Sequence, residues 1–471
     1  MLGGLRRVPA HGVLLGNMAA RVGGLACVFA ATLLLARSGG PAAVGVYALL
    51  HVLPGLVGTI ASAGLPVAAP YFLAGPDRED PRLRSTLVAI MAAGGVGGAL
   101  LWIAVSPFLA DLVFSDLSHG LVALAGITVL SRLVVITAKA CSQGSEDLAG
   151  SNAIIFVEQL PFLPAYAALY AAGVDSLTAV VVGLLVSDVV TASIAWTRLC
   201  RRGFFRGTTR PSLPLARRVA AFGTRGQVGG VMSLLNLRLD FVLLSAVAGP
   251  ATLGVYAVAS KFAELVRILG MALQYVFYPR FASDAVHAGE QARALMRKAA
   301  LLTTAAVVPL WVAAGLVIPL FYGSSFDDAV TPTRIILVGL ALDSVAGVVT
   351  AYLYGVGRPG LNSVAMGAGL CVTVALDLLL IPRFDAVGAA VASAVAYLAT
   401  AVLLLWFFAS VERSRHQRRF EEGVVAPVVP PGRFEADAGR GRRERAGDRQ
   451  VQEPEPESVK REPATGTNRQ S

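Results

Sequence analysis

The 471-residue chain contains few charged residues. Asp, Glu, Lys and Arg make up 15% of it, whereas a soluble domain typically carries about 25%. Hydrophobic residues account for 55%, and the mean hydropathy is +0.66. A soluble protein of this length has no interior large enough to hide so much apolar surface, but a lipid bilayer accommodates it. The composition therefore excludes a soluble globular protein and predicts an integral membrane protein.

Residues that commonly build metal and catalytic sites are also scarce. The four cysteines are widely separated and form no CxxC pair, which argues against a disulfide framework or a zinc site. The five histidines show no metal-ligand spacing, and no Ser/His/Asp arrangement is evident. The glycine-rich run at 94–98 lacks the strand and the lysine of a phosphate-binding loop. We therefore expect no enzymatic activity, no cofactor and no metal.

The net charge of +10 is distributed as in a membrane protein. Most arginines lie in the short segments 6–7, 78–84, 201–218 and 293–298 and in the C-terminal region from 413 onward. The alternate segments hold little beyond Arg37, Arg334 and Arg383. Because Lys and Arg accumulate in cytoplasmic loops, both termini are predicted to be cytoplasmic, in a multi-pass protein of the cytoplasmic membrane. This pattern also argues against a nucleic-acid partner.

Long apolar runs divide the chain into regular segments. A helix needs about 20 mostly apolar residues to cross the hydrocarbon core, and backbone exposed to lipid must be helical. Twelve runs meet this requirement, at 13–36, 44–72, 85–113, 119–141, 151–172, 177–199, 219–248, 254–282, 296–321, 331–355, 360–381 and 386–411. The sequence therefore predicts an all-α membrane protein with about twelve transmembrane helices.

The two halves of the chain repeat each other. The segment GPAAVGVYA, Gly40–Ala48, recurs 209 residues later as GPATLGVYA, Gly249–Ala257. Similar offsets relate Pro70 to Pro279, Phe72 to Phe281, Pro107 to Pro319 and Asp175 to Asp385. Six helices per copy is an even number, so both halves enter the membrane from the same side as parallel repeats. Secondary transporters are often built this way, with the binding site between the repeats.

The repeat also predicts the domain boundaries. We expect an N-terminal six-helix bundle at 1–200, a cytoplasmic linker at 201–218 and a C-terminal six-helix bundle at 219–412. Residues 413–471 are rich in Arg, Glu, Pro and Gly. Such a segment cannot bury enough apolar surface to offset its ordering entropy, so it is predicted to be a disordered cytoplasmic tail.

Several segments resemble a known family. RLDFVLLSAVAGPATLGVYAVASKF, from Arg238, resembles the start of the second half of polysaccharide flippases, and LLLARSGGPAAVGVYALL, from Leu33, resembles the matching part of their first half. Three further segments fit the same family in the expected order: YPRFA from Tyr278, IPLFYGSSFDDA from Ile318 and LLIPRFDAVGAAVASAVAYL from Leu379. These flippases belong to the multidrug/oligosaccharidyl-lipid/polysaccharide (MOP) exporter superfamily, which also contains the MATE transporters. The resemblance covers about residues 13–411.

The resemblance implies a fold and a function. The fold is a V-shaped MATE/MOP-like arrangement of two six-helix bundles. The function is translocation of undecaprenyl-pyrophosphate-linked oligosaccharides across the cytoplasmic membrane by alternating access, for cell-surface polysaccharide biosynthesis. The implied partners are the lipid-linked oligosaccharide and membrane lipid, with a proton or sodium ion as the candidate coupling ion and polysaccharide assembly enzymes as candidate protein partners.

Three other functions remain as alternatives. A multidrug/cation antiporter of the same superfamily would need an acidic cavity. Lipid II flippases usually carry two further C-terminal helices, where this chain has a polar tail. A membrane polymerase or glycosyltransferase would need a larger external loop than the one predicted at 322–330.

Ionisable residues within the predicted spans are the candidates for the site, because each costs roughly 2.5–3.5 kcal/mol to insert. Cations lining a cavity would stabilise a pyrophosphate, and the candidates are Arg21, Arg132, Arg238, Lys261 and Arg267. The acidic residues are candidates for ion coupling or for ion pairs, and they are Asp240, Glu264, Glu158, Asp188, Asp343 and Asp377.

Some of these charges could instead form structural ion pairs. Across the predicted turn at Gly249, Asp240 matches Lys261 in depth and Arg238 matches Glu264. Arg238 and Asp240 lie about 200° apart on a regular helix, so only one of them can face the next helix squarely. Arg132 and Asp343 are equivalent positions of the repeat, so they are predicted to lie on opposite sides of its axis.

Overall fold

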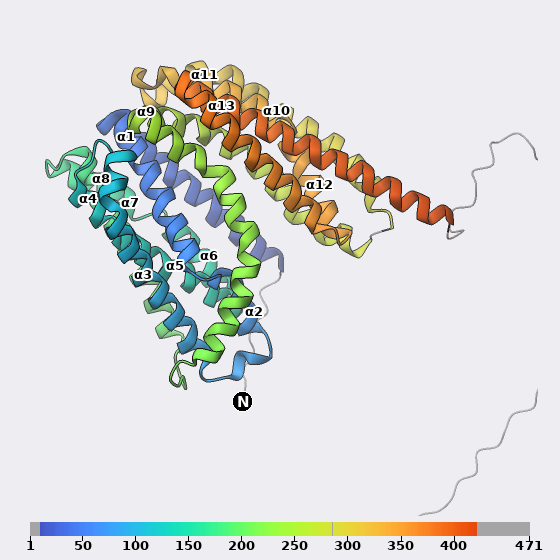
Figure 1. The fold of residues 1–471 in the computed structure, drawn as a ribbon, viewed down its shortest axis with the longest axis horizontal. Helices are drawn as coiled ribbons and strands as arrows, with labels where there is room; N and C mark the ends of the chain where they lie inside the picture. Colours follow the sequence, from blue (N-terminus) through green and yellow to red (C-terminus); the bar gives the residue numbers. More distant parts are fainter. Residues whose placement is uncertain (1–9, 285, 422–471) are drawn as a thin grey trace, which may run out of the picture. The chain divides into compact units, whose positions relative to one another are not determined.

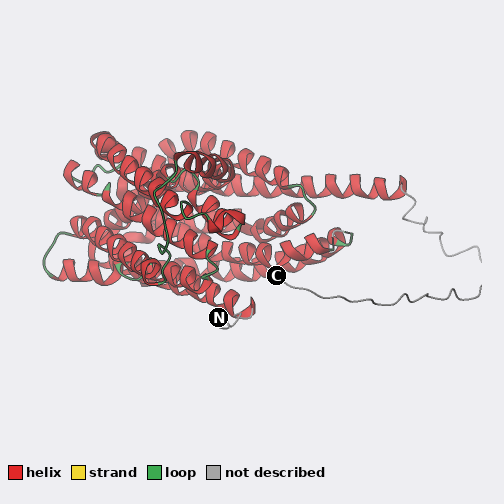
Figure 2. Cartoon of the chain, turned by 90° about the horizontal axis from the view of Figure 1, so that it is seen from below, coloured by secondary structure: helices red, strands yellow, loops and turns green. Residues whose placement is uncertain are grey.

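The computed structural model describes residues 10–284 and 286–421, and within these ranges the regular structure is entirely helical (Figure 2). The first half contains α1 (Ala10–Ala61), α2 (Leu65–Ala74), η1 (Pro76–Glu79), α3 (Leu83–Leu112), α4 (His119–Leu124), α5 (Ile127–Gly144), α6 (Leu148–Val157), α7 (Phe162–Ala171) and α8 (Ser176–Arg201). The second half contains α9 (Leu213–Ser283), α10 (Ala288–Tyr322), η2 (Ser324–Ala329), α11 (Val330–Gly339), η3 (Leu340–Leu342), α12 (Asp343–Gly355) and α13 (Pro359–Glu421).

Breaks inside three long helices account for the predicted number of spans. In the described ranges, nine helical stretches are long and apolar enough to cross a membrane. Three of them contain a residue with a non-helical backbone, namely Gly40 in α1, Gly249 in α9 and Asp385 in α13. Each break divides its helix in two, so the nine stretches comprise twelve segments. The sequence prediction of an all-helical protein with about twelve membrane helices is confirmed.

The breaks fall at equivalent positions of the repeat. Gly40 and Gly249, the first residues of the two GPxxxGVYA motifs, have φ values of 66° and 84°, a region that glycine adopts without a steric penalty. Asp385, with φ 46°, corresponds to Asp175. That residue caps α8, and its Oδ1 accepts a hydrogen bond from the backbone N–H of Thr178 at 3.0 Å. The internal repeat is therefore present in the backbone as well as in the sequence.

The two motifs pack directly against each other where α1 and α9 lie side by side (Figure 1). A Cβ added to Gly45 would lie 1.8 Å from the carbonyl oxygen of Pro250. A Cβ added to Gly254 would lie 1.9 Å from the carbonyl oxygen of Pro41. Only glycine allows this reciprocal contact between the helices. We call this end of the molecule, marked by Gly40 and Gly249, the motif end.

Hydrogen bonds also cross between the halves at the motif end. Arg37 Nε, in α1, donates to the carbonyl oxygen of Phe321 at 2.8 Å, close to the end of α10. Ser245 Oγ, in α9, donates to the carbonyl oxygen of Val113 at 2.8 Å, just past the end of α3. In each half, the first membrane segment thus donates a hydrogen bond to the end of the third membrane segment of the other half.

The opposite end, where α8 ends and α9 begins, is called the linker end. There Gly64 and Gly223 are in close backbone contact, and Arg218 Nη2 pairs with Asp77 Oδ1 at 2.6 Å. The start of α9 therefore packs against α2 of the first half. Helix α13 continues to Glu421, beyond the position at which the tail was predicted to begin, and residues 422–471 lie outside the described ranges.

Buried apolar side chains show how the two halves are joined. One cluster lies within residues 65–219 and a second within residues 281–411. A third combines side chains from both halves, among them Leu49 and Tyr256, and its members lie toward the motif end. The described residues up to 413 form one compact unit. The apolar core is thus shared at the motif end. Toward the linker end there are two separate clusters, and the first of them includes Leu215 and Val219 from the start of α9.

Candidate functional site

A polar cavity lies between the two halves. Its volume is about 290 Å³, and its lining includes Tyr47, His51, Thr59, Arg132, Lys139, Glu158, Asp188, Leu234 and Arg238. A smaller space of about 30 Å³ shares Tyr47, His51, Val52 and Arg238 with it and reaches Lys261. We call these two adjoining spaces the chamber. Helices α1, α5, α7 and α8 and the turn that follows α6 supply its walls from the first half, and α9 supplies the second half's contribution.

Arg132 and Asp188 form an ion pair in the wall of the chamber. Arg132 Nε donates to Asp188 Oδ2 at 2.8 Å, and the two side chains are 10% and 11% exposed. Arg132 Nη1 also donates to the carbonyl oxygen of His51 at 2.5 Å. The guanidinium therefore joins α5 to both α1 and α8, and its charge is largely balanced.

A second ion pair in the same wall was missed by the sequence analysis. Lys139 Nζ donates to Glu158 Oε2 at 2.7 Å, and both residues line the chamber. Glu158 was predicted as a site residue, but Lys139 was not, although it lies within the predicted span 119–141. It follows Arg132 by seven residues, a spacing that places both on one helix face, and this signal could have identified it.

His51 was also missed. It was grouped with the scattered histidines, yet it lines both parts of the chamber, where its ring packs 5.7 Å from that of Tyr47. A test of metal spacing alone could not identify a histidine that acts as a single polar group in a cavity.

Glu264 is shared by two cations. Arg238 Nη2 donates to Glu264 Oε1 at 2.8 Å, and Lys261 Nζ donates to Glu264 Oε2 at 3.0 Å. The three side chains are 22–28% exposed, and the Arg238 guanidinium also lies over the ring of Phe241 at 5.1 Å. One negative charge therefore faces two positive charges, which leaves this group with a net charge of +1.

The structure confirms one of the two ion pairs predicted from depth and overturns the other. Arg238 and Glu264 are paired, but Lys261 pairs with Glu264 and not with Asp240. Asp240 Oδ2 accepts hydrogen bonds from Tyr256 Oη at 2.6 Å and from Ser393 Oγ at 3.4 Å. Depth matching alone was wrong for this pair. The angle of about 200° between Arg238 and Asp240 let only one of them face the charged residues of the next segment, and Asp240 instead bonds the hydroxyl groups of Tyr256 and Ser393.

Two of the predicted cavity cations lie outside the chamber lining. Arg21 is exposed on α1, where its Nε donates to Asn17 Oδ1 at 2.9 Å. Arg267 lies over the ring of Tyr397 at 5.3 Å. In the described ranges it forms no ion pair with a carboxylate. Asp343, the repeat equivalent of Arg132, lies beside the backbone of Gly270, one turn from Arg267.

Asp377 is buried, and its carboxyl group stands alone among the described residues. It is 0% exposed, and neither of its carboxyl oxygens has a partner among the residues that the structure describes. A carboxyl group in this environment carries a large desolvation cost when ionised. A site of this kind can hold a proton or a small cation.

The chamber is electropositive overall. It contains four cations, Arg132, Lys139, Arg238 and Lys261, which are paired with three carboxylates, those of Asp188, Glu158 and Glu264. The excess positive charge arises at the shared carboxylate, where the two halves meet. This arrangement favours an anionic ligand over a cationic one.

Comparisons with known proteins agree with this architecture. The family described as polysaccharide biosynthesis protein matches residues 34–331, whereas a search of curated protein sequences finds no match. The chain is similar to the lipid II flippase MurJ in an inward closed conformation, with a TM-score of 0.67 and 12% identity over 86% of this chain and 88% of that one.

Two further solved structures have the same fold. The first is an inward-facing multidrug resistance transporter of the MATE family in the MOP superfamily. Its TM-score is 0.69, with 15% identity over 85% of this chain and 99% of that one. The second is a MOP superfamily transporter from Pyrococcus furiosus, described by a binding pocket of reverse polarity. Its TM-score is 0.53, with 12% identity over 84% of this chain and 95% of that one.

These matches confirm the predicted family and fold class, and they support a multi-pass membrane transporter or flippase. The family match spans more than half of the sequence. The chain therefore belongs to the polysaccharide biosynthesis protein family and has the transporter fold of the MOP superfamily.

Proposed function

We propose that this protein is a flippase for lipid-linked oligosaccharides and that the chamber holds the phosphate groups of the lipid carrier. The observation that supports this most directly is the Arg238–Glu264–Lys261 group, in which two cations share one carboxylate in a cavity between the halves. The proposed substrate class is an undecaprenyl-pyrophosphate-linked oligosaccharide, and translocation breaks none of its covalent bonds.

Electrostatics explains why such a group suits a diphosphate. Arginine binds phosphate through paired hydrogen bonds, and lysine acts as a point charge with three donors. In a partly buried site these interactions are stronger than in water. The volume of about 290 Å³ is at the lower end for small-ligand pockets. It suits a phosphate-bearing headgroup, while the sugars need space that opens toward the linker end.

The distribution of buried apolar side chains supports alternating access. One core cluster spans both halves toward the motif end, whereas two separate clusters lie toward the linker end, the first of which also includes the start of α9. We propose that the linker end is cytoplasmic, in the cytoplasmic membrane, and that the structure represents a state closed to the outside. Opening outward would then separate Gly45 from Pro250 and break the crossing hydrogen bonds of Arg37 and Ser245.

Asp240 and Asp377 are the proposed ion-coupling residues. Both are buried, with exposures of 3% and 0%. Asp240 is held by Tyr256 and Ser393, whereas Asp377 has no partner in the described part of the chain. A proton or a sodium ion bound to either carboxyl group would remove the free-energy cost of a buried charge, and release of the ion would restore that cost. These two residues are thus suited to linking ion binding to the change between inward-facing and outward-facing states.

The test is export of a surface polysaccharide in cells that carry single variants. Replacing Lys261 by Gln leaves Glu264 paired with Arg238, and replacing Arg238 by Gln leaves it paired with Lys261, so each variant keeps a neutral pair and should fold. We expect both to abolish export at normal protein levels, with Arg21→Gln as the control that retains it.

Normal export in both chamber variants and in the double variant would overturn the proposal. Deletion that leaves surface glycans intact but raises sensitivity to cationic dyes would indicate a multidrug exporter instead. Arrest of peptidoglycan synthesis would indicate a lipid II flippase.

A further inference from the structure

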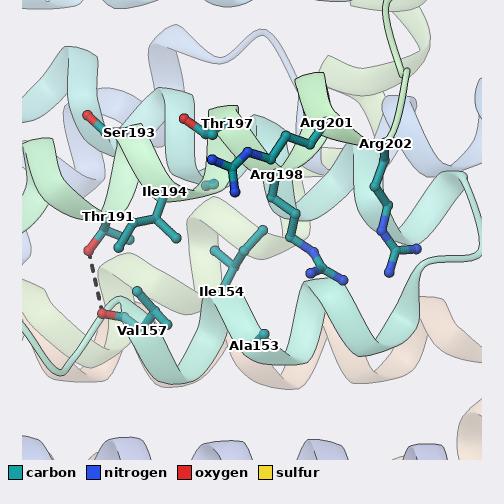
Figure 3. A pocket seen from close by; sticks show the side chains of 11 residues that line it. Ala153, Ile154, Val157, Thr191, Ser193, Ile194, Thr197, Arg198, Arg201 and Arg202 are labelled. Carbon is teal, nitrogen blue, oxygen red and sulfur yellow. Dashed lines mark hydrogen bonds between the residues drawn. The ribbon is translucent and has the colours of Figure 1, made fainter.

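A second cavity lies on the outer side of the first half, away from the chamber. It has a volume of about 640 Å³ and runs between α6 and α8 (Figure 3). Its lining is Ala153, Ile154, Val157, Thr191, Ser193, Ile194, Ala195, Thr197, Arg198, Arg201 and Arg202. We call it the α6–α8 groove.

The groove faces away from the space between the halves. The opposite side of α6 packs on α1, where Asn17 Nδ2 donates to Asn152 Oδ1 at 2.7 Å and Gln159 lies beside Gly24. Ala153 and Ile194, which line the groove, are exposed. In a membrane-spanning bundle, an exposed apolar surface of this kind faces lipid.

The groove is apolar at one end and cationic at the other. Figure 3 shows Val157, Ile154 and Ile194 toward one end and Arg198 and Arg202 toward the other, with the Arg201 side chain turned back toward Thr197, and Arg201 is the last residue of α8. From Thr191 to Arg201 the helix rises by about 15 Å, at about 1.5 Å per residue. This is half of a hydrocarbon core about 30 Å thick, and so it matches one leaflet.

The arginines carry more positive charge than the carboxylate beside them can balance. Asp147 Oδ2 accepts from Arg198 Nη2 at 3.1 Å, and its Oδ1 pairs with Arg202 Nη1 at 3.2 Å. Arg201 forms no ion pair within the described ranges. The three arginines and Asp147 together carry a net charge of +2. Glu146, the next residue, is exposed and does not line the groove.

We propose that the α6–α8 groove binds an anionic glycerophospholipid from the leaflet at the linker end. One acyl chain lies along Ile154, Val157 and Ile194, and the phosphate lies at the end of the groove that carries Arg201 and Arg202, whose exposed side chains turn toward it. The length of the apolar part suits an acyl chain rather than a long polyprenyl chain, and the excess of arginine selects an anionic headgroup. This site is separate from the transport site and would hold its lipid through the transport cycle.

The experiment is native mass spectrometry of the full chain, titrated with phosphatidylglycerol or with phosphatidylcholine of the same acyl composition. We expect phosphatidylglycerol to be retained preferentially. In the Arg201→Gln/Arg202→Gln double variant, Asp147 keeps Arg198 as a partner. The apparent Kd of this variant for phosphatidylglycerol should rise by roughly fivefold for each arginine removed. That factor corresponds to the attraction of about 1 kcal/mol that one basic residue contributes near an anionic surface. Arg297→Gln/Lys298→Gln on α10 is the matched control, because both residues are exposed and the loss of charge is equal.

Two additional measurements test whether the acyl chain contributes to binding as well as the headgroup. Ala153→Trp should fill the groove and also weaken retention, which tests the acyl-chain part of the site. Glycerol phosphate should not compete, because it lacks that chain. Equal retention of the two lipids, equal loss in the α10 control, no effect of Ala153→Trp, or displacement by an equal concentration of polyprenyl phosphate would each overturn the assignment.

Discussion

The contact between the two GPxxxGVYA motifs gives the sharpest structural prediction. In Gly45→Ala, the new Cβ would lie 1.8 Å from the carbonyl oxygen of Pro250, whereas real Cβ contacts are essentially never below 3.0 Å. The helices must therefore separate by about 1.2 Å. Overpacking of this kind costs typically 1–3 kcal/mol, and about 2 kcal/mol changes an equilibrium roughly 30-fold.

That cost applies only to states in which the motif end is closed. We therefore expect Gly45→Ala to shift the protein toward a state with an open motif end rather than to unfold it. The matched control is Gly97→Ala on α3, because a Cβ there meets nothing within 4 Å. This substitution should stabilise its helix by roughly 0.5–1 kcal/mol.

The assay is the distance between spin labels on either side of the motif end. Asp116 and Asp328 are exposed, lie one in each half and occupy equivalent positions of the repeat, and the four native cysteines would first be replaced. We expect a longer-distance population in Gly45→Ala that is absent from the wild type and from Gly97→Ala. A single unchanged distance in a well-folded Gly45→Ala protein would refute the packing argument.

The same contact makes a prediction about additivity. Gly45 and Gly254 hold the same pair of helices together, and a Cβ at either position forces them apart. The loss in free energy of unfolding should therefore be clearly smaller for the Gly45→Ala/Gly254→Ala double variant than the sum of the losses in the two single variants. The reason is that one separation of the helices relieves both contacts. Full additivity in thermal unfolding would show that the two contacts are independent.

Three further predictions concern single side chains. Ser245→Ala removes the hydrogen bond to Val113 and should weaken closure of the motif end by about 1 kcal/mol, measured with the same spin labels. Glu264→Gln leaves two adjacent cations without their carboxylate, so it should lower thermal stability by about 3–5 kcal/mol, and an added diphosphate should restore part of that loss. Asp377→Asn removes a buried, unpartnered carboxyl, so it should raise the melting temperature while lowering ion-dependent transport in proteoliposomes. Loss of stability with unchanged transport would contradict this role.

The fold could be predicted from the sequence because membrane helices have a strong compositional signal. The apolar runs predicted the membrane-spanning segments, and the repeated GPxxxGVYA motif predicted that the two halves are parallel repeats. The same motif marked two of the helix breaks, at Gly40 and Gly249. The predicted spans 360–381 and 386–411 also separate at Asp385, but its positive φ could not be predicted, since its repeat partner Asp175 has φ −57°.

The partners of the charged residues were harder to predict. Position along a helix gives depth, and so Arg238–Glu264 was found, but depth alone also suggested a pair between Asp240 and Lys261 that does not form. Which side chain lies across from which depends on helix rotation and packing. For the same reason, the sequence could list Arg21 and Arg132 as equivalent candidates, whereas the structure places only Arg132 in the chamber lining.

Binding of a short-chain prenyl diphosphate to the purified protein in nanodiscs tests the central claim most directly. A charge-assisted hydrogen bond contributes roughly 1.5–3 kcal/mol, so Lys261→Gln should raise the Kd by about 10- to 100-fold. Arg21→Gln, outside the chamber, should leave it unchanged. Equal affinity in the wild type and in Lys261→Gln would contradict the assignment of the chamber as the phosphate site.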